Sequence, residues 1–198
     1  IRDNPEAGIT FGQISFDRHI KSGGPIAGSA NYLPEMDDID PTRVKGLSFT
    51  AFKGNTIGCH AAIVRVIPET GHLELKRYVA AHDVGKAINP LGVEGQIEGG
   101  VGMGLGFSLT ERLMIDEEGQ VLNPNFADYK LLTSMDVPET EPIIVEVPAG
   151  YGPYGAKGLG EPTMGPPAAV IGNAINDAIG VRMHSTPMTP ENVLKEIN

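Results

Sequence analysis

Apolar and polar residues alternate most regularly between residues 60 and 79. Residues 60–67 are mostly apolar and β-branched, and a short segment ending in Gly71 separates them from a second run, residues 73–79. In that second run, alternate positions are occupied by Leu73, Leu75, Arg77 and Val79. Because successive side chains of a strand point to opposite faces, each run predicts a strand. Two strands joined by a glycine-containing turn predict a β-hairpin.

The segment after Asn89 has the residue spacing of a helix. Asparagine caps helix starts and proline fits the first helical position, so Asn89-Pro90 predicts a helix that runs to about Phe107. An apolar residue recurs at every fourth position, at Val93, Ile97, Val101 and Leu105. Glycines recur every three or four positions and form a glycine stripe, at Gly92, Gly95, Gly99, Gly102 and Gly106. Since each glycine destabilises a helix by roughly 1 kcal/mol relative to alanine, we expect another element or a ligand to lie close to this helix.

Weaker patterns predict the remaining elements. Strands are predicted over residues 109–115, 120–122 and 142–147, with a turn at 116–119 and a short helix near 128–132. Apolar residues at helical spacing predict a helix from Ala168 to Ile179, ended by Gly180. Thr189-Pro190 predicts the start of a last helix, which reaches Ile197.

The first fifty or so residues show little periodicity and predict irregular chain with one or two strands. An acidic patch from Glu35 to Asp40 lacks the spacing of a calcium-binding EF-hand loop and is best explained as a solvated surface. We therefore divide the chain into an irregular N-terminal segment, residues 1–55, and a folded domain, residues 56–198. The predicted fold class is α+β, a mixed sheet built on the β-hairpin with helices packed on it.

Composition narrows the possible partners. The chain has 198 residues, of which 40% are hydrophobic and 20% charged, so it can bury a core. The formal net charge of -10 disfavours nucleic acid as a partner, because phosphate binding needs a basic face. The single cysteine, Cys59, excludes an internal disulfide and is compatible with a cytoplasmic location. The longest apolar stretch, near residues 101–109, is too short to span a bilayer.

Several common site signatures are absent. The glycines at 102, 104 and 106 do not have G-x-G-x-x-G spacing, and Gly85-Lys86 is not followed by serine or threonine, so neither nucleotide-binding motif is present. The histidines lack metal-ligand spacing, and we expect each to be a surface residue or a hydrogen-bonded core residue. There is no nucleophile elbow, G-x-S-x-G.

The remaining candidate is the loop over residues 151–167, which carries Lys157 and Glu161 among glycines and prolines. The simplest explanation is a structural turn. A functional explanation is favoured because Glu161 precedes a nearly uncharged, apolar helix, where partial desolvation would suit a carboxylate for work as a general base. Glycines also leave room for a large flat or anionic ligand.

Two segments carry a family resemblance. Residues 81–100, AHDVGKAINPLGVEGQIEGG, and residues 152–161, GPYGAKGLGE, closely resemble the molybdopterin-binding subunit of the xanthine dehydrogenase/aldehyde oxidase family of molybdenum hydroxylases. The resemblance is clear from about Thr56 to the C-terminus and covers only the C-terminal part of that subunit.

The resemblance implies roles for individual residues. Glu161 would be the catalytic base of a hydroxylation that uses water-derived oxygen. Gln96 would lie beside the molybdopterin. The same wall of the cofactor site would be shaped by Gly99, Gly100, Lys157, Gly158 and Gly160. No side chain is expected to ligate the metal directly.

The resemblance also implies cofactors and partners. The cofactor would be molybdenum–molybdopterin, with the cytosine dinucleotide form as one variant, and iron–sulfur clusters and FAD would lie on partner chains. Partners would be the remainder of the molybdopterin-binding subunit, an iron–sulfur subunit and a flavin subunit; a homo-oligomer is also compatible. The predicted function is the C-terminal part of a molybdenum hydroxylase acting on an N-heteroaromatic substrate such as a purine. The alternatives are an aldehyde oxidoreductase of the same family and a truncated, non-catalytic fragment that binds no cofactor.

Overall fold

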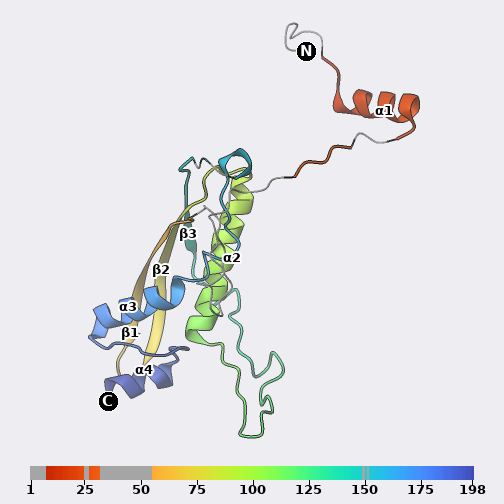
Figure 1. The fold of residues 1–198 in the computed structure, drawn as a ribbon. Coiled ribbons are helices and arrows are strands. Elements are labelled where there is room, and N and C mark those ends of the chain that lie inside the picture. The colour runs from red at the N-terminus through yellow and green to blue at the C-terminus, as the bar shows by residue number, and fades with distance from the viewer. Residues whose placement is uncertain (1–7, 25–26, 32–54, 149, 151) are drawn as a thin grey trace, which may run out of the picture. The chain divides into compact units, whose positions relative to one another are not determined.

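The computed structural model describes residues 8–24, 27–31, 55–148, 150 and 152–198 (Figure 1). The chain forms two units, residues 1–33 and residues 34–198, and each is described by itself. The predicted acidic patch at Glu35 to Asp40 lies outside the described residues. The predicted domain boundary at residues 55 and 56 stays a prediction.

The described part of the first unit contains one helix, α1 (Phe11–Ser22). Thr10 caps its start, because the Thr10 hydroxyl accepts a hydrogen bond from the Gln13 amide at 3.2 Å and the Gln13 side chain accepts one from the Thr10 amide at 2.9 Å. Gly23 ends the helix with a left-handed φ of 69°. The prediction of irregular chain with strands is therefore wrong over these residues. Capping residues, and not apolar periodicity, mark the helix.

The second unit is built on a three-stranded sheet with the order β1 (Gly58–Ile67), β2 (His72–Asp83), β3 (Thr140–Val145). The first two strands are antiparallel and form the predicted β-hairpin, and β3 lies parallel to β2. At the hairpin turn the Gly71 amide donates to the Ile67 carbonyl at 2.8 Å, and Gly71 has a φ of 69°. The predicted mixed sheet is confirmed.

The helices α2 (Pro90–Leu109), α3 (Pro167–Ile179) and α4 (Pro190–Ile197) confirm the three predicted helices. The Asn89 side chain accepts from the Gly92 amide at 3.2 Å, as expected of a helix cap. Gly180 ends α3 with a φ of 73°, and the Thr189 hydroxyl accepts from the Asn192 amide at 3.3 Å at the start of α4. Local sequence signals therefore fix where each of these helices begins or ends.

One face of the sheet and the inner sides of the helices form the core. Tyr78 and Ala80 of β2 are fully buried and point to the same face, because strand side chains alternate. They are joined by buried apolar residues of the three helices, namely Ile97, Val101, Leu105, Ile171, Ile175 and Val193. Burying one such side chain stabilises a fold by roughly 1.5–3 kcal/mol. The apolar residues predicted along α2 are thus part of the core, and Figure 1 shows α2 beside the sheet.

The glycines of α2 divide between two sides of the helix. A Cβ at Gly104 would lie 2.6 Å from Cγ of Pro167 and 2.7 Å from the Met164 carbonyl oxygen, and a Cβ at Gly100 would overlap Thr163. The expected close approach therefore occurs at these two glycines outside the predicted stripe, and within the stripe at Gly106, where a Cβ would overlap the Glu111 side chain. At two other residues of the stripe, Gly95 and Gly99, a Cβ would meet no atom within 4 Å.

The long loop after α2 differs from the prediction. Helix α2 continues to Leu109, and residues 111–122 form a loop with a single bridge between Ile115 and Val121 instead of two strands. The turn at 116–119 is confirmed, with the Gly119 amide donating to the Asp116 carbonyl at 3.1 Å. Residues 126–128 form a turn where a short helix near 128–132 was predicted, which was wrong. The apolar residues of this loop are exposed, so their spacing does not arise from packing of one strand face against the core.

A chain of three ring side chains runs across the sheet, with Tyr78 and His82 buried and His60 half-buried. Nδ1 of His60 lies 2.8 Å from the Tyr78 hydroxyl, and Nε2 of His60 lies 2.6 Å from Nε2 of His82. Nδ1 of His82 is buried and has no partner among the described residues. Burial, and secondarily the proximity of His82, lowers the pKa of His60 to about 4, and burial lowers the pKa of His82. Both imidazoles are therefore neutral at neutral pH.

This neutral pair makes the stability of the fold depend on pH. Unfolded histidine titrates near its ordinary value of 6.5, so the unfolded chain binds protons that the folded chain does not. We expect the free energy of unfolding, measured by urea denaturation, to fall by about 2 kcal/mol between pH 7 and pH 5. The variant His60→Gln should flatten this dependence, whereas His72→Gln, on the exposed end of β2, should keep it. An unchanged slope in His60→Gln would contradict the assignment.

The close packing at Gly104 predicts opposite effects for two alanine substitutions in α2. Gly104→Ala should lower the free energy of unfolding by about 1–3 kcal/mol, because its Cβ must displace Pro167 or the Met164 backbone. Gly95→Ala, which meets open space, should raise it by up to about 1 kcal/mol through helix propensity. Chemical denaturation of both variants checks the difference. Equal stabilities would show that α3 does not constrain α2 at this point.

Candidate functional site

The glycine-rich loop is held against the end of β2 by backbone hydrogen bonds. The Lys86 amide donates to the Gly155 carbonyl at 3.0 Å, and the Lys157 amide donates to the Val84 carbonyl at 2.9 Å. Within the loop, a short 3-10 helix (Pro153–Gly155) follows Gly152, which has a φ of 91°. The predicted shaped loop is thus confirmed over the described residues.

A buried ion pair joins Lys157 to Asp83, the last residue of β2. The Lys157 and Asp83 side chains are only 8% and 10% exposed. The Asp83 carboxylate also accepts hydrogen bonds from the Gly85 amide at 3.0 Å and the Val147 amide at 3.3 Å. The hydrogen bond from Lys157 is the main cause that lowers the pKa of Asp83 below its ordinary value. Lys157 therefore fixes the loop to the strand ends, a partnership that sequence reasoning did not identify.

Thr163 joins the loop to α2. Its side chain is fully buried, and its hydroxyl donates to the Gln96 carbonyl at 3.3 Å. Gly100, one turn further along α2, provides the space for the Thr163 side chain. Gly100, predicted to face the cofactor, therefore packs against this chain's own loop. Sequence reasoning missed Thr163, although its place two residues after Glu161 and before an apolar helix could have indicated an inward-facing position.

The two motif segments meet at a cavity of about 230 Å³ between α2 and the loop. Gln96 and Lys157 both line it, together with Val93, Ala156 and Leu159. Residues 61 positions apart in the sequence are thus brought to one site by the fold. The predicted site residues Gly99, Gly100, Gly158, Gly160 and Glu161 do not line this cavity.

Glu161 and its neighbouring glycines lie on the outer side of the loop. Glu161, Gly158 and Gly160 are exposed, whereas Leu159 between the glycines is buried. A Cβ at Gly158, Gly160 or Gly99 would meet no atom within 4 Å, so the backbone is open to a flat ligand at all three positions. The expected partial desolvation of Glu161 is not supplied by the described part of this chain, because its own turn directs Thr163 inward and Glu161 outward.

Among the described residues, no group of three or more histidine, cysteine, aspartate or glutamate side chains could hold a metal ion. The open glycine backbone and the Gln96 amide instead suit an organic cofactor that is bound by hydrogen bonds and close backbone approach. No helix in the described part of the chain is long and apolar enough to cross a membrane.

Comparison with known proteins identifies the family. The family model of the molybdopterin cofactor-binding domain matches residues 2–138. The chain belongs to this family. The match begins upstream of Thr56, so this molybdopterin cofactor-binding domain resembles its family over more of the N-terminal segment than its two motifs indicate.

Individual relatives agree with this assignment. The chain is 43% identical over 125 residues to the xanthine dehydrogenase molybdenum-binding subunit of Escherichia coli O157:H7, an alignment that covers 63% of this chain and 17% of the relative. It is 30% identical over 148 residues to the aldehyde oxidoreductase molybdenum-binding subunit PaoC of Escherichia coli strain K12, which covers 74% and 20%. The crystal structure of quinoline 2-oxidoreductase from Pseudomonas putida 86 matches with a TM-score of 0.67 and 36% identity, over 71% of this chain and 18% of that chain.

These comparisons confirm the predicted resemblance to the xanthine dehydrogenase/aldehyde oxidase family and its α+β fold. The matched relatives are molybdenum-binding oxidoreductase subunits, and the chain spans only about 17–20% of their length. The predicted roles of Gln96 and Glu161 stay predictions.

The buried ion pair predicts a large difference between two lysine substitutions. Lys157→Met leaves the Asp83 carboxylate buried without its cation and should lower the free energy of unfolding by about 3 kcal/mol. Lys86→Met removes an exposed pair, 2.8 Å from Glu146, and should cost less than about 1 kcal/mol. Urea denaturation measures both. Similar losses in the two variants would show that the Asp83–Lys157 pair does not anchor the loop.

Proposed function

We propose that this chain is the C-terminal section of the catalytic subunit of a molybdenum hydroxylase. The observation that carries the proposal is the meeting of the two motif segments, since Gln96 and Lys157 line one cavity and the Thr163 hydroxyl ties the loop to α2. Gly99, Gly158, Gly160 and Glu161, which flank this arrangement, are exposed. Membership of the molybdopterin cofactor-binding family supports the same function.

Gln96 and the open glycines would hold the molybdopterin. Gln96 has an exposed side chain whose amide both donates and accepts hydrogen bonds, as the pterin edge requires. Gly99, Gly158 and Gly160 would permit close approach, because no side chain stands between their backbone and the ligand. Lys157 would hold the glycine-rich loop in place and not contact the cofactor through its ammonium, since that group is paired with Asp83. The bound molybdenum cofactor supplies the redox chemistry, in the cytosine dinucleotide form or a shorter one.

Glu161 would be the catalytic base. Its carboxylate is exposed and is fixed at the start of a turn in which the Met164 amide donates to the Glu161 carbonyl at 3.1 Å. A base must lie within hydrogen-bond reach of the proton that it removes, and a rigid loop holds it there. The remainder of the subunit would cover Glu161 and exclude water, which would suit the carboxylate for proton transfer.

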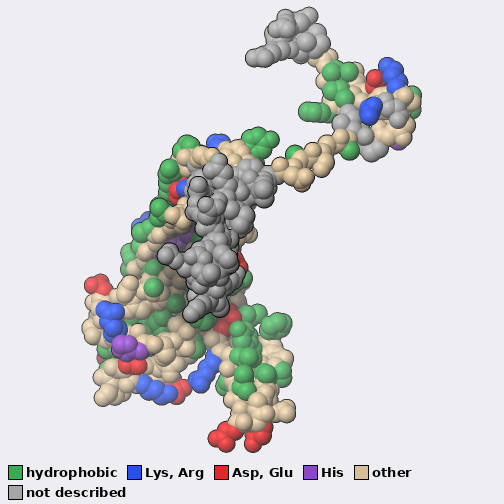
Figure 2. Space-filling model, in the orientation of Figure 1, with side chains coloured by type: hydrophobic (Ala, Val, Ile, Leu, Met, Phe, Trp, Pro, Cys, Tyr) green, Lys and Arg blue, Asp and Glu red, His purple; other side chains and the backbone are tan. Residues whose placement is uncertain are grey.

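The outer side of α2 supports the proposal of a larger assembly. Large apolar side chains are exposed at Leu91 (78%), Met103 (62%) and Phe107 (55%), at both ends of the open positions Gly95 and Gly99. Exposed apolar groups in one row are typical of a contact surface. Figure 2 also shows hydrophobic side chains along the long loop after α2. The expected partners are the remainder of the molybdopterin-binding subunit, an iron–sulfur subunit and a flavin subunit that carries FAD.

The favoured substrate is an N-heteroaromatic such as a purine. Xanthine and quinoline, named in two of the relatives, both contain a nitrogen heterocycle, and these relatives are 43% and 36% identical to this chain. An aldehyde is the second candidate, supported by the aldehyde oxidoreductase relative at 30% identity. A truncated fragment without cofactor is the non-catalytic alternative.

The role of Glu161 predicts a separation of cofactor binding from catalysis. In a complex assembled with the remaining subunit sections, Glu161→Gln should reduce hydroxylation by about a thousandfold or more, because a general base contributes on the order of 100- to 10,000-fold. Molybdenum and pterin contents should not change. Glu118→Gln, on the exposed turn at 116–119, is the matched control and should keep full activity.

Two measurements test this proposal. Metal analysis of the wild-type complex shows whether the chain participates in cofactor binding, and turnover of a purine and an aldehyde by the two variants shows whether Glu161 acts as base. Absence of molybdenum from a complex with all partner chains would support the non-catalytic alternative. Activity retained in Glu161→Gln would refute the assignment of the base while leaving cofactor binding in place.

A further inference from the structure

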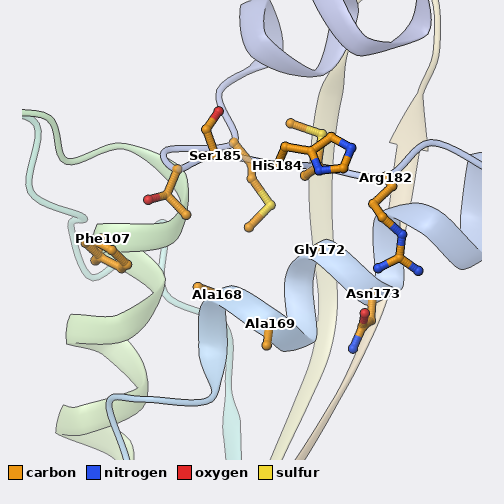
Figure 3. A pocket seen from close by; sticks show the side chains of 11 residues that line it. Phe107, Ala168, Ala169, Gly172, Asn173, Arg182, His184 and Ser185 are labelled. Carbon is orange, nitrogen blue, oxygen red and sulfur yellow. The ribbon is translucent and has the colours of Figure 1, made fainter.

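A second hollow, of about 460 Å³, lies between α3 and the segment that follows it, residues 181–188 (Figure 3). Its volume lies within the range of about 300–1,000 Å³ that is usual for small-molecule sites. None of its lining residues belongs to the candidate site described above. Apart from Phe107, which also belongs to the exposed apolar row of α2, its side chains have no role in the proposed function.

One end of this hollow carries polar groups without partners. The side chains of Arg182, Asn173 and His184 line it and make no hydrogen bond or ion pair with the described residues. No aspartate or glutamate is among the lining residues, although the chain carries a net charge of -10. A guanidinium presents a planar fork of donors that matches a carboxylate. The hollow thus offers an unpaired cation, with an amide donor beside it.

Apolar groups line the floor of the hollow, and Ser185 and Thr186 add two hydroxyls to its rim. Ala168 and Gly172 lie along α3, and Met188, which is 4% exposed, lies against Gly172, with its sulfur 3.9 Å from the position of a Cβ there. Figure 3 shows Arg182 and Asn173 at one end and the Phe107 ring at the opposite end. The guanidinium and the amide therefore lie at the end of the hollow away from the Phe107 ring, whose side also carries the Ser185 hydroxyl.

We propose that this hollow binds a small carboxylate with an apolar, planar body. The Arg182 guanidinium donates hydrogen bonds to both carboxylate oxygens, and the Asn173 amide donates a further one. The body lies over Ala168 and Gly172 toward Phe107, where it contacts apolar atoms. The positive charge of Arg182 favours an anion. The apolar wall favours an organic carboxylate with an apolar ring over an inorganic anion.

Binding of benzoate to the full chain, followed by NMR titration, tests the proposal. Benzamide has the same shape without the charge, and inorganic phosphate has the charge without the apolar body. We expect saturable binding of benzoate, with benzamide and phosphate each at least about tenfold weaker, because charge-assisted hydrogen bonds and apolar burial contribute separately. Equal binding of benzoate and benzamide, or of benzoate and phosphate, would overturn the proposal.

Three variants locate the binding site. Arg182→Gln should weaken benzoate binding at least about tenfold, whereas Arg18→Gln, an exposed arginine of α1 in the other unit, should leave it unchanged. Ala169→Leu fills the hollow from the exposed side of α3 without changing any charge and should also weaken binding. Thermal denaturation shows that each variant is folded. Unchanged binding in folded Arg182→Gln, or in folded Ala169→Leu, would refute the site.

Discussion

The ion pair between Asp83 and Lys157 is the interaction on which the arrangement of the second unit depends. It lies where β2 ends, beside β3, and where the glycine-rich loop begins to turn toward α2. Two buried charges stabilise a structure only when each is compensated, and Asp83 achieves this with Lys157 and two backbone amides. The pair thereby gives the loop one allowed position relative to the sheet.

Beyond the ion pair, close side-chain packing sets the position of the loop and α3 relative to α2. The loop continues to Thr163, which enters the space left by Gly100, and then to Pro167, which packs on Gly104. These contacts require the absence of side chains on that side of α2. The glycines of one helix thus serve two purposes, because those facing the loop permit packing while Gly95 and Gly99 leave an open surface.

This chain spans a small part of its relatives' length, and the contacts that stabilise its second unit lie within the chain itself. The core residues, the ion pair and the histidine–tyrosine chain are internal to the second unit. Glu161, the flanking glycines and the exposed apolar residues of α2 all lie outside. The main stabilising contacts therefore lie within this chain, whereas the proposed functional residues face what would be supplied by other parts of the subunit.

The hairpin, the three capped helices and the two motif segments could be predicted from the sequence, because strand alternation, Asn89, Thr189 and Gly180 act locally. Helix α1 was not predicted, because its apolar residues lack helical periodicity and only its capping residues mark it. The loop after α2 was predicted as strands, because its exposed apolar residues are spaced like those of a strand. Three contacts became visible only in the folded chain: Lys157 pairs with Asp83, Gly100 faces Thr163, and Gln96 and Lys157 line one cavity. Those contacts join residues more than sixty positions apart, and long-range packing and charge compensation leave no periodic signal in the sequence.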